Sequence, residues 1–176
     1  SMGTTYLTNA TPARHTQGSE GHHQPGLLDD FDPGSPGELA KAYTRGSNYQ
    51  HILACTGMCL FVNMAIPHVD VLTEFLNTLT GWDVTLEELV ETGERIAAMR
   101  QAFNIREGIT QPDNELAGRL LGNPPHPRGP LAGVKIDADT NVREYLAAMK
   151  WNKETAIPEK KRLEELGLND VALDIG

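Results

Sequence analysis

The sequence lacks any apolar run near the roughly 20 residues that a membrane-spanning helix requires. The longest candidate, residues 52–66, is interrupted by Thr56, Gly57 and Asn63. The first residues are polar and rich in Thr, Pro and His, without the apolar stretch of a secretory signal. We therefore expect neither insertion into a membrane nor secretion.

Cysteine is scarce, with two residues in a chain of 176. A pair of cysteines cannot form the disulfide framework of a small secreted protein. Cys55 and Cys59 lie four residues apart, which suits thiols that are free or bound to a metal in a reducing compartment. This pattern predicts a cytoplasmic location.

Positive charge is also in the minority, with 15 Lys and Arg against 24 Asp and Glu and a formal net charge of −9. Nucleic-acid binding needs clustered Lys and Arg to replace counterions, so this balance argues against nucleic acid and against anionic membranes as partners. The sequence contains no G-x-G-x-x-G, Walker or G-x-S-x-G motif. These absences leave dinucleotide, nucleotide and serine-hydrolase chemistry without support.

Residues 1–37 are rich in Gly and Pro and have no helical periodicity, so we expect a loop-like lead-in that is the end of a preceding domain. Ser1-Met2 has the character of an expression scar. From residue 38 to residue 176 the pattern is helical, and we expect one C-terminal domain.

Apolar spacing and capping residues predict an all-α fold, an irregular bundle in which each helix contributes one apolar stripe. Thr85 and Glu88 have the spacing of a capping box. Only residues 134–136 alternate like a strand. Helices are expected at residues 39–43, 69–79, 85–107 and 140–149. A further helix is capped by Ser47 and runs toward Cys59, and the last one is opened by Pro158 and ended by Gly167. Residues 116–121 are expected to hold a short turn.

The segment from Ala54 to Cys59 carries the clearest chemistry, because thiolates are the preferred ligands of iron–sulfur clusters. Such clusters take four thiolates, so this chain alone cannot complete one. Two other interpretations stay open. The cysteines could be buried and act as small hydrophobic residues, or they could bind zinc, although two further ligands of fixed spacing are missing.

Histidines are the other candidates for chemistry. Arg14-His15 could orient an anionic or carbonyl group and transfer a proton near neutral pH, although from the residues alone a solvated loop is the simpler interpretation. His22-His23 suggests a solvated loop more than a metal site. For His51 and His68 we expect a capping or surface role.

Several short blocks occur in an order that resembles the C-terminal region of the aldehyde ferredoxin oxidoreductase family. The resemblance extends over most of residues 11–168, and its specificity comes from the order of the blocks. They are residues 79–83, 93–96, 103–108, 113–116, 119–121 and 160–168.

The resemblance implies an enzyme that oxidises aldehydes to carboxylic acids with a tungsten (or molybdenum) bis-pterin and passes electrons through a 4Fe–4S cluster to ferredoxin. In this family the fourth cluster cysteine lies in a D-x-x-G-x-C type motif. Cys59 takes the place of that ligand, and Gly57 and Met58 take the place of the adjoining cofactor-binding backbone. Ala54 stands where the family has Asp, so the hydrogen bond from that Asp to a pterin is expected to be absent or replaced. Cys55 does not fall on a ligand position.

His15 matches the segment that brings a histidine near the metal, which makes it the candidate for proton transfer. The cofactor base and three cluster cysteines would come from the N-terminal, cofactor-binding part of the same enzyme. We therefore expect this chain, taken alone, to be inactive and to bind neither cluster nor pterin. The alternative is a non-catalytic helical interaction module on the same fold.

Overall fold

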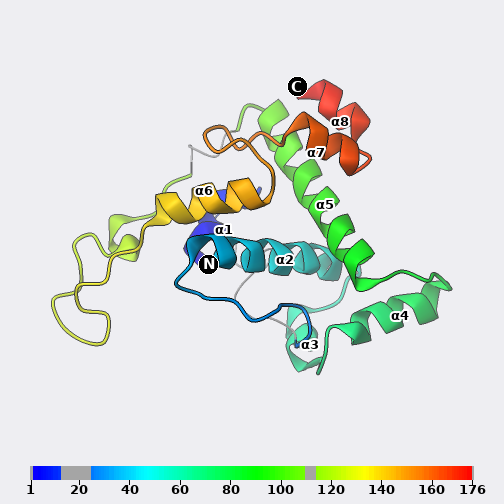
Figure 1. Ribbon diagram of the computed structural model, residues 1–176, viewed down its shortest axis with the longest axis horizontal. Coiled ribbons are helices and arrows are strands. Elements are labelled where there is room, and N and C mark those ends of the chain that lie inside the picture. The colour runs from blue at the N-terminus through cyan, green and yellow to red at the C-terminus, as the bar shows by residue number, and fades with distance from the viewer. Residues whose placement is uncertain (1, 13–24, 110–113, 176) are drawn as a thin grey trace.

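The computed structural model describes residues 2–12, 25–109 and 114–175, and in this part of the chain it is helical (Figure 1). No strand occurs there beyond two isolated bridges, so the predicted all-α class is confirmed, and residues 134–136 form no strand. The elements are α1 Met2–Thr8, α2 Pro36–Cys55, α3 Leu60–Ala65, α4 Asp70–Thr80, α5 Leu86–Arg106, the 3-10 helix η2 Gly118–Leu121, α6 Ala138–Ala148, α7 Lys160–Glu165 and α8 Asn169–Asp174.

Helix α2 is the centre of the fold and packs against α5 and α6. It is one continuous helix of 20 residues that starts at Pro36, a residue suited to a first helical position because it has no N–H to satisfy. The predicted helix start at Ser47 is wrong, since Ser47 lies buried in the middle of α2. Every residue from Gly46 to Leu53 is buried, because α2 is covered on several sides.

Gly93 allows the close crossing of α2 and α5. A Cβ at this position would lie 2.5 Å from the carbonyl carbon and 2.9 Å from the Cα of Asn48, and closer still to its carbonyl oxygen. Real Cβ atoms do not approach backbone atoms this closely, so only glycine fits without a shift of one helix.

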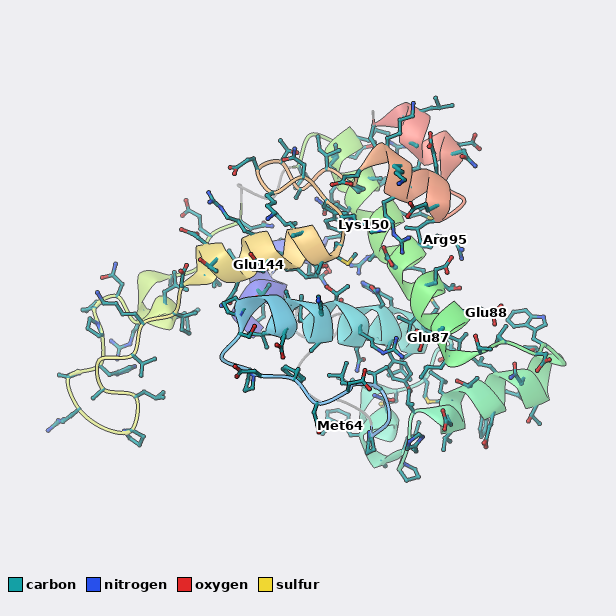
Figure 2. All side chains as sticks on the ribbon, viewed as in Figure 1. Met64, Glu87, Glu88, Arg95, Glu144 and Lys150 are labelled. Carbon is teal, nitrogen blue, oxygen red and sulfur yellow. The ribbon has the colours of Figure 1, made fainter. Side chains whose placement is uncertain are left out.

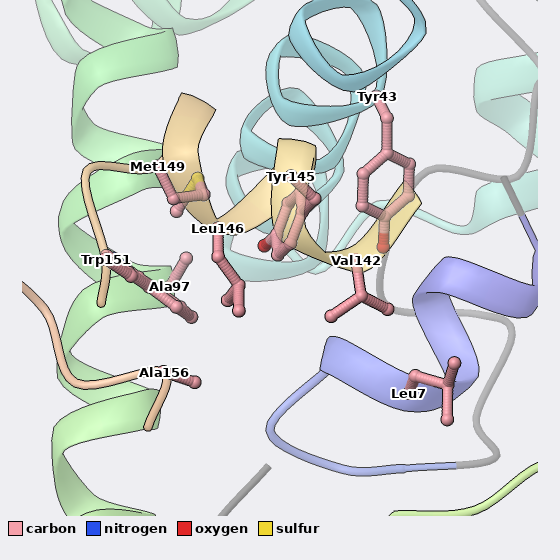
Figure 3. Packing of buried hydrophobic residues seen from close by; sticks show 9 residues of the cluster. All are labelled: Leu7, Tyr43, Ala97, Val142, Tyr145, Leu146, Met149, Trp151 and Ala156. Carbon is pink, nitrogen blue, oxygen red and sulfur yellow. The ribbon is translucent and has the colours of Figure 1, made fainter. Parts of the chain in front are cut away.

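The largest apolar cluster joins α6 to α2, α5 and α1 (Figure 3). Three aromatic rings form its middle, with Tyr43 and Tyr145 edge to face at 4.9 Å and Tyr145 and Trp151 edge to face at 6.2 Å. Leu146 and Met149 are completely buried beside them. The helix expected at residues 140–149 thus faces this core with Val142, Tyr145, Leu146 and Met149.

A second cluster fills the space between α2, α4 and α5, and a third holds α7 and α8 against α5. Arg162 of α7 donates two hydrogen bonds of 2.7 Å to the carboxylate of Glu94 on α5. Arg95 in turn donates to the carbonyl of Leu166 at the end of α7. The helix predicted from Pro158 to Gly167 is α7, which begins two residues after Pro158 and ends before Gly167, and α8 follows it as a short helix that was not predicted.

Two helix ends are set by local chemical signals that are visible in the sequence. Both halves of the Thr85–Glu88 capping box are present at the start of α5. Gly81 ends α4 in the left-handed conformation, with φ 73°. Each of these helix ends is set by residues close together in the chain, so the sequence is enough to predict it.

The lead-in 1–37 differs from the loop that was predicted, because residues 2–8 form helix α1. Leu7 belongs to the largest core cluster and Leu27 to the second, so both ends of this segment pack on the helical body. The division into a lead-in of residues 1–37 and a domain of residues 38–176 stays a prediction.

Candidate functional site

The turn between α2 and α3 carries the residues predicted to bind a cofactor. Helix α2 ends at Cys55, where Thr56 N–H donates to the carbonyl of Ile52 at 3.0 Å. Gly57 then adopts φ 71°, which reverses the chain at low cost because glycine has no Cβ. Cys59 is the N-cap residue of α3, and its carbonyl accepts a hydrogen bond from Asn63 N–H.

Both cysteines are free and exposed at this turn. The interpretation of buried cysteines that act as small hydrophobic residues is therefore wrong. The thiols also do not share one helix, because α2 ends at Cys55 and α3 begins after Cys59. A Cβ placed at Gly57 would meet nothing within 4 Å, so the space outside the turn is open.

Met58 and Leu60 fix the turn from the inner side, where both are half-buried against the second core cluster. Just beyond Cys59, α3 exposes two large apolar side chains. Phe61 is 77% exposed and Met64, labelled in Figure 2, is 49% exposed. The turn is thus a firmly anchored, partly apolar surface that presents two thiols outward.

These two thiols are too few to hold a metal without help. In residues 2–12, 25–109 and 114–175 there is no group of three or more His, Cys, Asp and Glu side chains that could hold a metal ion. In the same residues no helix has the length and apolar character to cross a membrane. The turn can supply one or two thiolates to a site whose other ligands lie elsewhere.

A partly buried polar cluster lies between α2, α5 and the residues that follow α1. Arg100 of α5 donates to Thr11 Oγ1 at 3.0 Å and contacts Nδ1 of His51 at 3.4 Å. Asn104 donates to the carbonyl of Ala10 at 2.7 Å. These bonds hold the end of α1 and the residues after it on the surface of α5.

His51 is the member of this cluster that the sequence interpretation missed. Its predicted capping or surface role is wrong, because it is only 5% exposed. Burial lowers its pKa to about 4, and the nearby Arg100 charge acts in the same direction. The residue type of His51 did not indicate that its side chain would be buried. By contrast, His68 has the predicted surface and capping role, pairing with Asp70 at the start of α4.

The remaining candidates cannot be placed. Arg14, His15 and His22-His23 lie outside the described residues. Of the predicted site residues, the structure therefore brings Gly57, Met58 and Cys59 together in one turn and leaves the predicted role of His15 untested.

The helices and the turn with its two exposed thiols define a mainly helical protein, and in the residues that the structure describes the turn lacks the further ligands that a metal site would need. Residues 1–168 match the family described as "Aldehyde ferredoxin oxidoreductase, domains 2 & 3". The chain belongs to this family.

Curated relatives include tungsten-containing aldehyde ferredoxin oxidoreductases from three organisms. The one from Pyrococcus abyssi is 29% identical over 119 residues, which is 68% of this chain and 19% of the relative. That from Pyrococcus furiosus is 29% identical over 117 residues, 66% of this chain and 19% of the relative. The Thermococcus kodakarensis enzyme is 28% identical over 117 residues, with the same two shares. The chain thus matches about a fifth of the length of these relatives.

Proposed function

We propose that this chain acts as a C-terminal part of an aldehyde:ferredoxin oxidoreductase, in which Cys59 supplies the fourth thiolate of a 4Fe–4S cluster. The other three thiolates and the base of the cofactor come from the N-terminal, cofactor-binding part of the same enzyme. The substrates are an aldehyde and water, the acceptor is ferredoxin, and the compartment is the cytoplasm.

The exposed thiol of Cys59 is the observation that carries this proposal. A ligand shared between two parts of a protein has to lie at a surface, and its backbone has to be held in place by its own part. Cys59 meets both requirements, because it is exposed while Met58 and Leu60 on either side pack into the second core cluster. Thiolate is also the donor that iron in such clusters prefers.

The apolar side chains next to Cys59 support docking of this surface onto another part of the protein. Phe61 and Met64 expose large apolar area within five residues of the thiol. On α4, Phe75 and Leu79 are 55% and 72% exposed, although they are four residues apart, the spacing of one apolar helix face. Large exposed apolar groups occur at contacts with a partner, and covering Phe61 and Met64 would also exclude water from the cluster.

The roles that we propose for the individual residues come from the family resemblance. The backbone of Gly57 and Met58 lines the cofactor side of the turn, and His15 holds or moves a proton near the substrate. When bound, the pterin-held tungsten or molybdenum supplies the two-electron oxidation of the aldehyde, and the cluster supplies the path of electrons to ferredoxin.

The experiment is a comparison of Cys59→Ala and Cys55→Ala in the complete protein. Cys59→Ala removes a ligand, so we expect loss of the cluster's absorbance and electron paramagnetic resonance signals and of aldehyde oxidation. Cys55→Ala is the matched control, an exposed cysteine on the same turn, and should retain both. Full cluster content and activity in Cys59→Ala would contradict the proposal.

A second experiment uses the 176-residue chain itself. Anaerobic addition of iron and sulfide should yield no stable stoichiometric cluster, because one matched thiolate cannot replace four. A stable cluster in this chain would show that it does not depend on another part. Metal analysis of the purified chain tests the zinc interpretation, because that interpretation requires stoichiometric zinc in the chain.

One observation favours a second candidate, a non-catalytic helical interaction module. Ala54 stands where the family motif has Asp, and alanine cannot offer a hydrogen bond to a pterin. Under this candidate, Cys59→Ala in the complete protein would leave every measured activity unchanged.

A further inference from the structure

Helix α3, whose N-cap residue is Cys59, has its polar and apolar side chains placed in reverse. Of the α3 side chains that the structure describes, only Asn63 is buried, at 0% exposure, whereas Phe61 and Met64 are exposed. A surface helix normally turns its apolar residues inward and its polar residues outward. An apolar side chain at position 63 would pack on the body of the fold without the cost of burying an amide. Packing alone therefore does not explain this asparagine.

Asn63 connects the backbone of Cys59 to the core of the fold. Its N–H donates to the carbonyl of Cys59 at 3.1 Å, and its Oδ1 accepts a long hydrogen bond of 3.4 Å from the hydroxyl of Tyr49 on α2. Tyr49 is 1% exposed and belongs to the second core cluster. Burial raises the pKa of Tyr49 to about 12, so the hydroxyl keeps its proton and stays a donor.

The placement of α3 depends on contacts with the rest of the fold. A helix of six residues is too short to be stable by itself in water. Leu60 packs against the second core cluster and keeps α3 close to α2. Apolar packing has no preferred direction, whereas a hydrogen bond has one. The contact between Tyr49 and Asn63 can therefore fix the rotation of α3 about its own axis, which packing of Leu60 leaves open.

We propose that Asn63 and Tyr49 are positioning residues for Cys59, which set the orientation in which its thiolate is presented to the cluster. This inference rests on the proposed function, in which Cys59 is a cluster ligand. Both residues act through the backbone of Cys59, because thiolates and not amides or phenols are the donors that hold such clusters. Sites whose supporting residues leave a ligand loose by about 1 Å lose their function.

The test in the complete protein compares Tyr49→Phe, Asn63→Leu and the double variant. Each single change leaves one buried polar group without the other, so both should be less stable in urea unfolding. The double variant removes both groups and should regain most of that stability. In all three, an iron chelator should remove the cluster at least fivefold faster than from the parent. The electron paramagnetic resonance signal of the reduced cluster should also broaden.

The matched control is Tyr43→Phe. Tyr43 is likewise a buried tyrosine of α2, but it lies in the largest core cluster with its ring against Tyr145 of α6 (Figure 3). This variant loses a hydroxyl from the same helix and should keep the parental signal and chelation rate. Cys59→Ala in the same assays should lose the cluster entirely.

A second readout needs no cluster and uses the 176-residue chain. Hydrogen exchange of the amide of residue 63 reports on its bond to the carbonyl of Cys59. We expect protection of this amide to fall at least tenfold in Tyr49→Phe, Asn63→Leu and the double variant. Protection of the amides of α6 should stay unchanged, and circular dichroism should show the parental helix content.

Two results would overturn the inference while the proposed function stands. They are a folded double variant that keeps the parental chelation rate and signal, and equal effects of Tyr49→Phe and Tyr43→Phe on the cluster. Failure of the proposed function looks different, because Cys59→Ala itself would then keep the cluster. Unchanged exchange protection at residue 63 in the variants would overturn the inference in either case, since the placement of α3 would not depend on this pair.

Discussion

Replacing Gly93 with alanine should destabilise the fold, although alanine is intrinsically a better helix residue than glycine. The added Cβ would lie 2.5 Å and 2.9 Å from the carbonyl carbon and Cα of Asn48. Carbon atoms in contact normally lie 3.5–4.0 Å apart, so α2 and α5 would have to separate by roughly 1 Å or more. Neither the backbone of Asn48 nor that of residue 93 can move by itself, because α2 and α5 are both packed against other elements.

The magnitude follows from two opposing effects. Overpacking of a tight core costs about 1–3 kcal/mol and occasionally more. Glycine to alanine in a helix returns up to about 1 kcal/mol. Because the clash is with backbone, the packing effect should prevail, and we expect a net loss of about 2 kcal/mol. For a domain of this size that corresponds to a fall in Tm of roughly 4–8 °C.

The assay is urea unfolding followed by circular dichroism, with Gly37→Ala as the matched control. Gly37 also lies in α2, but a Cβ there would meet only the flexible carboxylate of Glu144, at 3.6 Å. Gly37→Ala should therefore be neutral or stabilising. If Gly93→Ala were as stable as Gly37→Ala, the close crossing of α2 and α5 would be refuted.

The remaining predictions concern a buried histidine, an ion pair and a helix cap. His51 has a folded pKa of about 4, below its unfolded value near 6.5, so the unfolded chain binds more protons between these values. Stability should thus be fully present above pH 6.5 and fall as the pH drops toward 4. His51→Gln should flatten the slope of unfolding free energy against pH between 5 and 6.5, and an unchanged slope would place His51 in solvent. Arg162→Gln removes two charged hydrogen bonds to Glu94, each partner being largely shielded from solvent, and should cost about 1.5–3 kcal/mol in urea unfolding. Loss of less than 0.5 kcal/mol would mean that α7 does not depend on this pair. Thr85→Ala removes the N-cap of α5 and should cost about 1 kcal/mol, whereas Thr85→Ser should retain most of that stability; equal values for the two variants would exclude capping by the hydroxyl.

The proposed cluster site could be located in the sequence but not characterised there. The position of Cys59 in the motif Ala54 to Cys59 follows from the resemblance, whereas its exposure does not, because free cysteine is among the most frequently buried residue types. Exposure depends on where α2 ends and on which core Met58 joins. Both are set by contacts with residues far away in the chain.

The sequence alone determined two kinds of feature: helix ends that are set by neighbouring residues, and the family, which follows from the order of several blocks along the chain. The capping box at Thr85 and the left-handed Gly81 set helix ends through bonds between neighbouring residues. The order of short blocks gave the family, and the structure shows that one of them, residues 160–168, includes Arg162, which ties α7 to α5.

Only the tertiary structure decided which polar groups are buried and which apolar groups are exposed. Ser47 and His51 have the residue types of caps and surfaces, yet they are buried because α2 runs through the centre of the fold. Phe75 and Leu79 have the spacing of a core stripe, yet they are exposed. Periodicity specifies the apolar face of a helix, but the arrangement of the neighbouring elements determines whether anything covers that face.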